Sequence, residues 1–241
     1  MIPKKIHYCW FGGNPLPKSA RKYIKTWKKY FPDYEIIEWN EDNFSINYND
    51  YVNQAYMNKK YAFVADVARL YALKQQGGIY FDTDIEILRR PDNFFQNGEV
   101  IMAFESNRII MTGFFAAKKD NKFIADWLNS YDSMKFLNDD GSFDETPNTF
   151  RVSSLLKQYG MIENGEKQEL SNGVIIYPKE IFGAYDVDNS GYVINKDTVL
   201  VHHCKNSWMP LSYKVKDVPK RLLAKCIGVE RVKKVRKIIK G

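Results

Sequence analysis

The chain has 241 residues, of which 44% are hydrophobic and 15% aromatic, so a globular protein is expected rather than a disordered one. The formal net charge of +7 is concentrated in residues 220–241, where nine basic residues stand against one acidic residue. The remaining sequence is nearly neutral, which excludes a basic nucleic-acid-binding surface spread over the whole chain.

Apolar periodicity and turn residues predict strands that alternate with helices along the chain. The predicted strands cover 4–13, 34–39, 78–84, 99–105, 113–119, 173–182 and 197–204. The predicted helices cover 17–31, 52–75, 121–136 and 149–160. Gly77 and Gly78 are expected to end the second helix. This alternation favours one α/β domain over residues 1–219, with a mostly parallel central sheet flanked by helices.

Two aspartates, Asp82 and Asp84, follow the apolar strand segment "GGIYF". On a strand, residues two apart point to the same side, and ligands bind at the carboxyl ends of strands in α/β sheets. Two carboxylates held this close repel each other unless a proton or a cation lies between them. We therefore expect a Mg²⁺ or Mn²⁺ site here, although a solvated turn with two capping aspartates would also fit the triplet.

A second pair of charged residues, Asp66 and Arg69, lies in the otherwise apolar segment "AFVADVARLYAL". Residues three apart share one face of a helix. Charges in such a segment are expected either to pair with each other or to face a polar cavity, and the spacing alone leaves both possibilities open.

Three segments together resemble glycosyltransferase family 32, a group of sugar transferases that contain a DxD motif. The most specific is "ADVARLYALKQQGGIYFDTDIEIL" at 65–88, and "IHYCWFGG" at 6–13 and "HHCKNSW" at 202–208 agree with it in order. The sequence is also similar to the glucosyltransferase domain of the large clostridial toxins. The resemblance implies a GT-A fold, but this chain is far shorter than the toxin domains, so acceptor specificity does not carry over.

The resemblance also implies roles for residues that bind the donor. Trp10 would stack on uracil in a mouth formed with Tyr8, Gly12 and Gly13. Asp66 would accept hydrogen bonds from the donor sugar, and Arg69 would lie beside the sugar and the diphosphate. The residues expected to contact the diphosphate and cover the site are Asn206, Ser207 and Trp208.

The expected cation, Mn²⁺ or Mg²⁺, would be held by Asp84 directly and by Asp82, which would also reach the ribose. His203 aligns with a further metal position of the family, and His202 is the alternative ligand because only one of two neighbours on a strand faces the cleft. The residues with expected catalytic roles are Asp66, Arg69 and Asp84.

The resemblance therefore predicts a retaining hexosyltransferase that moves galactose or glucose from a UDP-sugar to a lipid-linked or oligosaccharide acceptor in surface polysaccharide synthesis. The polyprenyl diphosphate class is the favoured lipid. Two alternatives are a metal-dependent nucleotidyltransferase or phosphatase and a non-catalytic basic binding module. No nucleic-acid partner is expected.

The last 22 residues, 220–241, place apolar side chains at spacings of three and four among many basic ones. This pattern predicts a basic amphipathic helix that lies on an anionic membrane surface or packs on the domain. The sequence shows no signal-peptide pattern, no apolar run long enough to span a bilayer, and an odd number of cysteines. We expect a cytoplasmic protein, peripheral on the inner face of a bacterial plasma membrane.

Overall fold

The computed structural model describes residues 1–91, 94–95, 98–186, 191–204, 228–229 and 231–232. A seven-stranded sheet forms its centre, with the strand order β2-β1-β3-β6-β5-β8-β7. Its strands are β1 (Lys5–Cys9), β2 (Glu35–Trp39), β3 (Gly78–Phe81), β5 (Val100–Ala103), β6 (Phe114–Ala117), β7 (Gln168–Glu169) and β8 (Val174–Tyr177).

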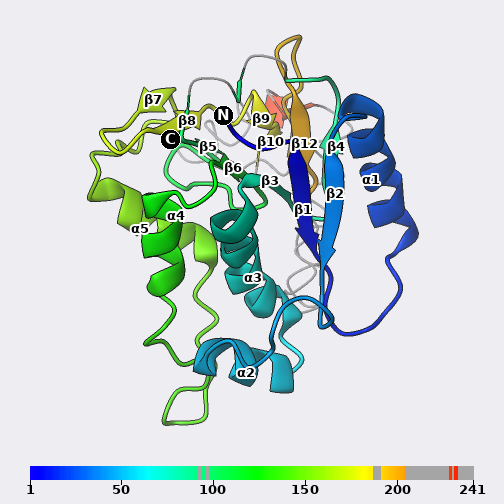
Figure 1. The fold of residues 1–241 in the computed structure, drawn as a ribbon. Coiled ribbons are helices and arrows are strands. Elements are labelled where there is room, and N and C mark those ends of the chain that lie inside the picture. Colours follow the sequence, from blue (N-terminus) through cyan, green and yellow to red (C-terminus); the bar gives the residue numbers. More distant parts are fainter. Residues whose placement is uncertain (92–93, 96–97, 187–190, 205–227, 230, 233–241) are drawn as a thin grey trace.

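Five helices and two small sheets surround the central sheet in the described part of the chain (Figure 1). The helices are α1 (Lys18–Tyr30), α2 (Asp50–Met57), α3 (Tyr61–Gln76), α4 (Lys122–Asn129) and α5 (Asn148–Lys157). The small sheets are β4-β12-β9 and β10-β11, with strands β4 (Ile85–Ile87), β9 (Phe182–Gly183), β10 (Tyr185–Asp186), β11 (Gly191–Tyr192) and β12 (Leu200–His202).

The α/β class is confirmed, but the expectation of a mostly parallel sheet is wrong, because the central sheet is mixed. β1 pairs in parallel with β2 and β3, and β5 pairs in parallel with β8. β6 is antiparallel to both β3 and β5, and β7 is antiparallel to β8. A parallel neighbour needs a crossover of a dozen or more residues, usually a helix. The loop 104–113 is too short for one, so the chain turns back after β5 and enters β6 antiparallel.

The predicted helix over 52–75 is two helices, α2 and α3, with a break at residues 58–60. Lys59 has φ of 58°, a left-handed conformation that interrupts the helical path. Asn49 caps the start of α2 by accepting a hydrogen bond from the backbone N–H of Val52. Gly77 follows α3 with φ of 62°, which confirms the predicted stop.

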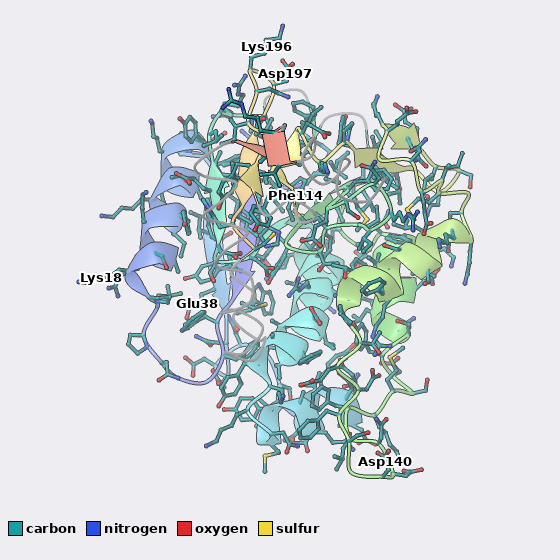
Figure 2. All side chains as sticks on the ribbon, turned by 180° about the vertical axis from the view of Figure 1, so that it is seen from behind. Lys18, Glu38, Phe114, Asp140, Lys196 and Asp197 are labelled. Carbon is teal, nitrogen blue, oxygen red and sulfur yellow. The ribbon has the colours of Figure 1, made fainter. Side chains whose placement is uncertain are left out.

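Successive side chains of each strand point to opposite faces of the sheet, so the apolar interior forms two layers, one on each face. Tyr80 and Phe115 pack on the side of α2, α3 and α4. Phe81 and Phe114 pack on the other side, with α1 and the β4-β12-β9 sheet. Phe114 is fully buried, and Figure 2 shows it well inside the molecule, with Asp140 near one end and Lys196 near the opposite end. The sheet is therefore covered on both faces, and its strand ends are left to form a site.

The predicted tail, 220–241, lies mostly outside the described residues. Gly228, Val229, Arg231 and Val232 are described, and the two valines are buried beside Val193. Within the described part of the chain, no helix combines the length and apolar character that a membrane span requires. The division at residue 219 and the amphipathic helix remain predictions.

Candidate functional site

A cleft of about 770 Å³ lies at the carboxyl ends of β1 and β3. β5 ends at the same edge, and β6 begins there, because β6 runs antiparallel to both of its neighbours. Six residues predicted from the sequence line this cleft: Trp10, Asp66, Arg69, Asp82, Asp84 and His202. The carboxyl-end rule for α/β sheets therefore holds in this mixed sheet.

Arg69 is the fixed centre of the cleft floor and is only 5% exposed. Its Nη2 lies 3.0 Å from Asp66 Oδ1 and 3.5 Å from Asp82 Oδ1. Its Nε donates to the carbonyl of Ala65 at 3.0 Å, and its Nη1 donates to the carbonyl of Thr112 at 2.7 Å. These contacts hold the guanidinium in one orientation, so the Asp66–Arg69 pair is internal and also faces the cavity. Both readings of the sequence pattern apply at once.

The carboxyl group of Asp66 is 13% exposed and lies on α3. Burial raises its pKa from 3.8 to about 6, and the nearby Arg69 opposes this rise only in part. A carboxyl with this pKa changes protonation near neutral pH, as groups in binding clefts often do. Burial therefore disfavours the carboxylate form of Asp66, and Arg69 offsets this only in part. Hydrogen bonds donated by a ligand in the cleft would stabilise the charged form.

Asp82 and Asp84 converge, but not through the strand geometry that the sequence suggested. β3 ends at Phe81, and residues 82–84 form a turn in which the N–H of Ile85 donates to the carbonyl of Asp82 at 3.0 Å. Asp82 Oδ1 also accepts a hydrogen bond from the hydroxyl of Tyr80 at 2.8 Å. The predicted convergence is therefore correct in outcome and wrong in cause, because a turn directs both carboxylates into the cleft.

His202, the alternative ligand, is the histidine that joins the aspartates. Its Nε2 lies 3.3 Å from Asp84 Oδ1. Burial acts to lower the pKa of His202, but Cys204 and Asp84 raise it well above the ordinary value. An imidazolium at this position offsets the charge of Asp84.

His203, the preferred ligand in the sequence interpretation, points to the opposite face. Its Nε2 lies 2.8 Å from Glu86 Oε2, its Nδ1 lies 2.7 Å from the hydroxyl of Tyr192, and its ring stacks on Tyr23 with centroids 4.5 Å apart. Adjacent residues of a strand alternate in direction, so β12 directs His202 inward and His203 away. The choice of His203 as the cleft-facing residue is corrected to His202.

The ligand atoms of Asp82, Asp84 and His202 all lie within 4.8 Å of one another. Two carboxylate oxygens and one imidazole nitrogen form a donor set that suits Mn²⁺, and Mg²⁺ accepts the same carboxylates with water in the remaining positions. The residues present therefore fit the divalent cation that the DxD motif implies.

The segment predicted to bind the base, residues 6–13, lies partly in the cleft and partly in the core. Trp10 is half-buried and lines the cleft, and its Nε1 donates to the carbonyl of Asn14 at 2.5 Å. Tyr8 does not line the cleft: it is 7% exposed, its hydroxyl donates to Glu38, and its ring packs edge-on against Trp27. The expectation for Tyr8 is therefore corrected, because the alternation of β1 directs this side chain toward α1.

Gly12 and Gly13 form the turn that follows Trp10, with φ of 94° and 68°. The N–H of Gly12 donates to Glu41 Oε1 at 2.7 Å, and a Cβ at Gly12 would lie 2.4 Å from the ring of Tyr61. Glycine is needed there for close approach to a ring that itself lines the cleft. Neither glycine lines the cleft among the described residues. Both shape the turn, and contact with the donor stays a prediction. Asn206, Ser207 and Trp208 lie outside the described residues.

Several cleft residues were missed by the sequence interpretation: Glu105, Thr112, Asn148, Phe150 and Cys204. Glu105 could have been found, since it follows the predicted strand "EVIMAF" at the carboxyl edge. Asn148 begins α5, and no motif distinguishes it from an ordinary first residue of a helix. Cys204 could not be found from spacing, because the three cysteines show no metal-type spacing and spacing does not detect ligands that the fold brings together.

Comparison with known proteins finds that part of this chain is similar to glycosyltransferases. Residues 17–101 match the family described as "Glycosyltransferase sugar-binding region containing DXD motif". The matched region includes Asp66, Arg69 and both aspartates of the 82–84 turn. Residues 17–101 are therefore similar to a sugar-binding region of the DxD type.

An uncharacterized glycosyltransferase of Acanthamoeba polyphaga mimivirus is 30% identical to this chain over 118 residues. The matched part is 45% of this chain and 46% of the viral protein, so the similarity spans less than half of that relative. Both sequence matches are therefore to glycosyltransferases.

Three solved structures show a weaker likeness. PaToxG glycosyltransferase is 21% identical, with 53% of this chain and 59% of that chain covered and a TM-score of 0.42. A glycosyltransferase involved in glycosylation of the major capsid of PBCV-1 is 13% identical, with 85% and 95% covered and a TM-score of 0.43. The galactosyltransferase LgtC, in complex with donor and acceptor sugar analogs, is 12% identical, with 95% and 94% covered and a TM-score of 0.40. At these TM-scores, the likenesses do not establish a common fold.

Proposed function

We propose that the protein is a metal-dependent retaining glycosyltransferase of GT-A type that uses a UDP-sugar as donor. The observation that carries the proposal is the meeting, in one cleft, of the partly buried Asp66–Arg69–Asp82 ion pairs with Asp84 and His202. A sugar diphosphate offers hydroxyl donors, phosphate oxygens and a base, and the cleft offers carboxylates, a guanidinium, a cation site and the Trp10 ring.

Each end of the cleft suits a different part of the donor. Trp10 would stack on the uracil base, since base–aromatic contacts of this kind contribute about 1–3 kcal/mol each. Arg69 would bind sugar or phosphate oxygens, because its orientation is already fixed by two backbone carbonyls and two carboxylates. Asp66 would accept hydrogen bonds from sugar hydroxyls.

Asp82, Asp84 and His202 would hold the cation, Mn²⁺ or Mg²⁺, which when bound stabilises the negative charge of the departing diphosphate. The residues of the chain itself position the donor and keep the reacting sugar in the partly buried cleft. A covalent route with retention would need a carboxylate free to attack the sugar. The cleft carboxylates Asp66, Asp82 and Asp84 are engaged by Arg69 and His202. The fourth, Glu105, is engaged by His202 and Cys204. This arrangement favours front-face attack by the acceptor hydroxyl.

The acceptor side is proposed at Phe150, which lines the cleft and is 51% exposed. An exposed aromatic ring beside the donor site is suited to stack on the apolar face of an acceptor sugar. Galactose and glucose remain the favoured donor sugars. The lipid-linked acceptor and the membrane location rest on the basic segment 220–241, and flotation of the full chain with anionic liposomes, compared with a chain ending at Pro219, tests both.

The decisive experiment is a screen of UDP- and GDP-sugars for Mn²⁺-dependent sugar release. We expect one UDP-hexose to give UDP and free sugar, and Asp84→Asn to abolish the release. Asp140→Asn is the matched control, because this aspartate is not among the residues that line the cleft and lies near one end of the molecule (Figure 2). Release of pyrophosphate or free phosphate without sugar transfer would instead support a nucleotidyltransferase or phosphatase.

A further inference from the structure

Beside the two aspartates, the cleft holds a second group of potential ligands: Glu105, His202 and Cys204. Cys204 Sγ lies 3.6 Å from Glu105 Oε1 and 3.5 Å from His202 Nδ1. His202 Nδ1 lies 3.5 Å from Glu105 Oε1, which closes a nearly equilateral triangle of one sulfur, one nitrogen and one oxygen. The three residues come from the segments after β5 and at the end of β12, so the fold alone brings them together.

The edges of this triangle match the spacing of ligands around a tetrahedral zinc ion. Zinc bonds of about 2.3 Å to sulfur and about 2.0–2.2 Å to nitrogen and oxygen, at tetrahedral angles, separate the ligand atoms by about 3.4–3.6 Å. The observed separations are 3.5, 3.5 and 3.6 Å. An ion could therefore replace the internal hydrogen bonds of the cluster without moving the three side chains apart.

The imidazole of His202 is oriented for this role by Asp84. His202 Nε2 lies 3.3 Å from Asp84 Oδ1, while Nδ1 faces Cys204 and Glu105. Metal-binding histidines almost always donate their second ring N–H to a carboxylate, a backbone carbonyl or water, which fixes the tautomer that leaves the other nitrogen to bind the ion. Asp84 would supply that carboxylate.

We propose that Glu105 Oε1, His202 Nδ1 and Cys204 Sγ form a site for a thiophilic divalent cation of the zinc class, which excludes the Mn²⁺- or Mg²⁺-type ion from Asp82 and Asp84. On binding, the thiol of Cys204 loses its proton to solvent, and Nδ1 of the protonated His202 ring does the same. The resulting thiolate selects the softer ion. All three residues line the cleft, so water can fill the fourth position. The exclusion rests on the cation site of the proposed function, but the thiophilic site itself does not.

Exclusion follows because the two candidate cation sites share His202, and because Nε2 of this ring faces Asp84, a ligand of the other site. Binding at Nδ1 requires the proton on Nε2, where it is donated to Asp84. Binding of the other cation by His202 Nε2 requires the proton on Nδ1 instead. One neutral ring cannot serve both ions, and Asp84 is held by His202 in one state and by the harder ion in the other. A cation in the thiophilic site would therefore prevent Mn²⁺ or Mg²⁺ from binding in the cleft, and with it the transfer reaction.

The first test measures Zn²⁺ and Co²⁺ binding to the full chain. We expect Co²⁺ to show thiolate-to-metal charge-transfer absorption, and Cys204→Ala to lose it and to weaken Zn²⁺ binding at least about 100-fold. Glu105→Gln should weaken Zn²⁺ binding while keeping the thiolate absorption. Cys9→Ala is the matched control, because it removes another buried thiol and leaves the triangle intact. Thermal melts verify that each variant is folded. Equal Zn²⁺ affinity in the parent chain and in both Cys204→Ala and Glu105→Gln would overturn the site.

The second test measures Mn²⁺ binding by electron paramagnetic resonance with and without one equivalent of Zn²⁺. We expect Zn²⁺ to weaken Mn²⁺ binding at least about tenfold in the parent chain and by less in Cys204→Ala, where Zn²⁺ acts only by direct competition for the Mn²⁺ ligands. An equal effect in both chains would overturn the exclusion. Undiminished Mn²⁺ binding in the zinc-loaded parent chain would overturn the exclusion. If Mn²⁺ binds to neither form, the exclusion and the cation assignment of the proposed function are both wrong, whereas the Co²⁺ absorption still decides the thiophilic site.

Discussion

Replacing Asp66 with asparagine should make the folded protein more stable at neutral and alkaline pH while removing its activity. Asparagine has the shape of the protonated carboxyl group and carries no charge to bury. Arg69 would keep Asp82 and the carbonyls of Ala65 and Thr112 as partners, so its own charge would not be left alone. In the parent chain, the buried carboxylate of Asp66 therefore lowers the stability of the folded state. Its proposed role is to bind the donor sugar.

The size of the effect follows from the pKa of Asp66, which burial raises from 3.8 to about 6. A raised pKa means that the folded state binds the proton more tightly than the unfolded state. The stabilisation that this proton gives the folded state is therefore complete at pH values below 3.8, the pKa in the unfolded chain. It is lost as the pH rises through about 6, the pKa in the folded chain. A shift of about two units corresponds to about 3 kcal/mol, and about half of this appears between roughly pH 5 and pH 8.

The assay is urea denaturation of the parent chain and Asp66→Asn at about pH 5 and about pH 8, in EDTA. The variant's gain in unfolding free energy should be larger at the higher pH by about 1.5 kcal/mol. Asp144→Asn is the matched control, because Asp144 also pairs with an arginine, Arg151, at 2.5 Å. Burial acts to raise the pKa of Asp144, but hydrogen bonds from Thr146 and Arg151 lower it below 3.8. The effect of this control should therefore not change between the two pH values. The same difference between Asp66→Asn and the parent chain at both pH values would refute the reasoning.

Three further predictions concern the proposed donor and acceptor sites. Asp84→Ala, or EDTA on the parent chain, should reduce sugar release at least about 100-fold with an unchanged fold by circular dichroism, and full activity in either case would exclude the cation site. Trp10→Ala should weaken UDP binding by about 1–3 kcal/mol in isothermal titration, whereas a core role would appear as a lower melting temperature with unchanged UDP affinity. Phe150→Ala should raise the acceptor KM about fivefold and leave kcat unchanged, so a loss confined to kcat would remove this ring from the acceptor site.

Much of the fold was predictable because its strands are short apolar runs bounded by glycine or charged residues. β1, β2, β3, β5, β6 and β8 all lie within predicted strands. The direction of β6 was not predictable from its own residues, since "GFFAA" fits a parallel and an antiparallel strand equally well. The break in the second predicted helix was also hidden, because a lysine with positive φ, Lys59, leaves no mark in the pattern of apolar residues.

The site was predictable where one helix or one turn sets the geometry. Asp66 and Arg69 share a helix face, and Asp82 and Asp84 share a turn, so sequence spacing brought each pair together. Which of two adjacent histidines faces the cleft depends on the register of β12 against β4, and the two residues are identical in type. No pattern in "VLVHHC" distinguishes them, because a slip of one residue reverses every side chain.

The repulsion between Asp82 and Asp84 has an answer within the chain itself. Arg69 lies 3.5 Å from Asp82, and His202 lies 3.3 Å from Asp84, so each carboxylate has a positive partner of its own. The two partners differ in kind, because the guanidinium of Arg69 keeps its charge at any relevant pH, whereas the imidazole of His202 can lose its proton and become a ligand. The fixed charge suits a permanent place beside the donor. The imidazole of His202 can hold either a proton or a metal ion. This property suits its position, which is shared by the two candidate cation sites.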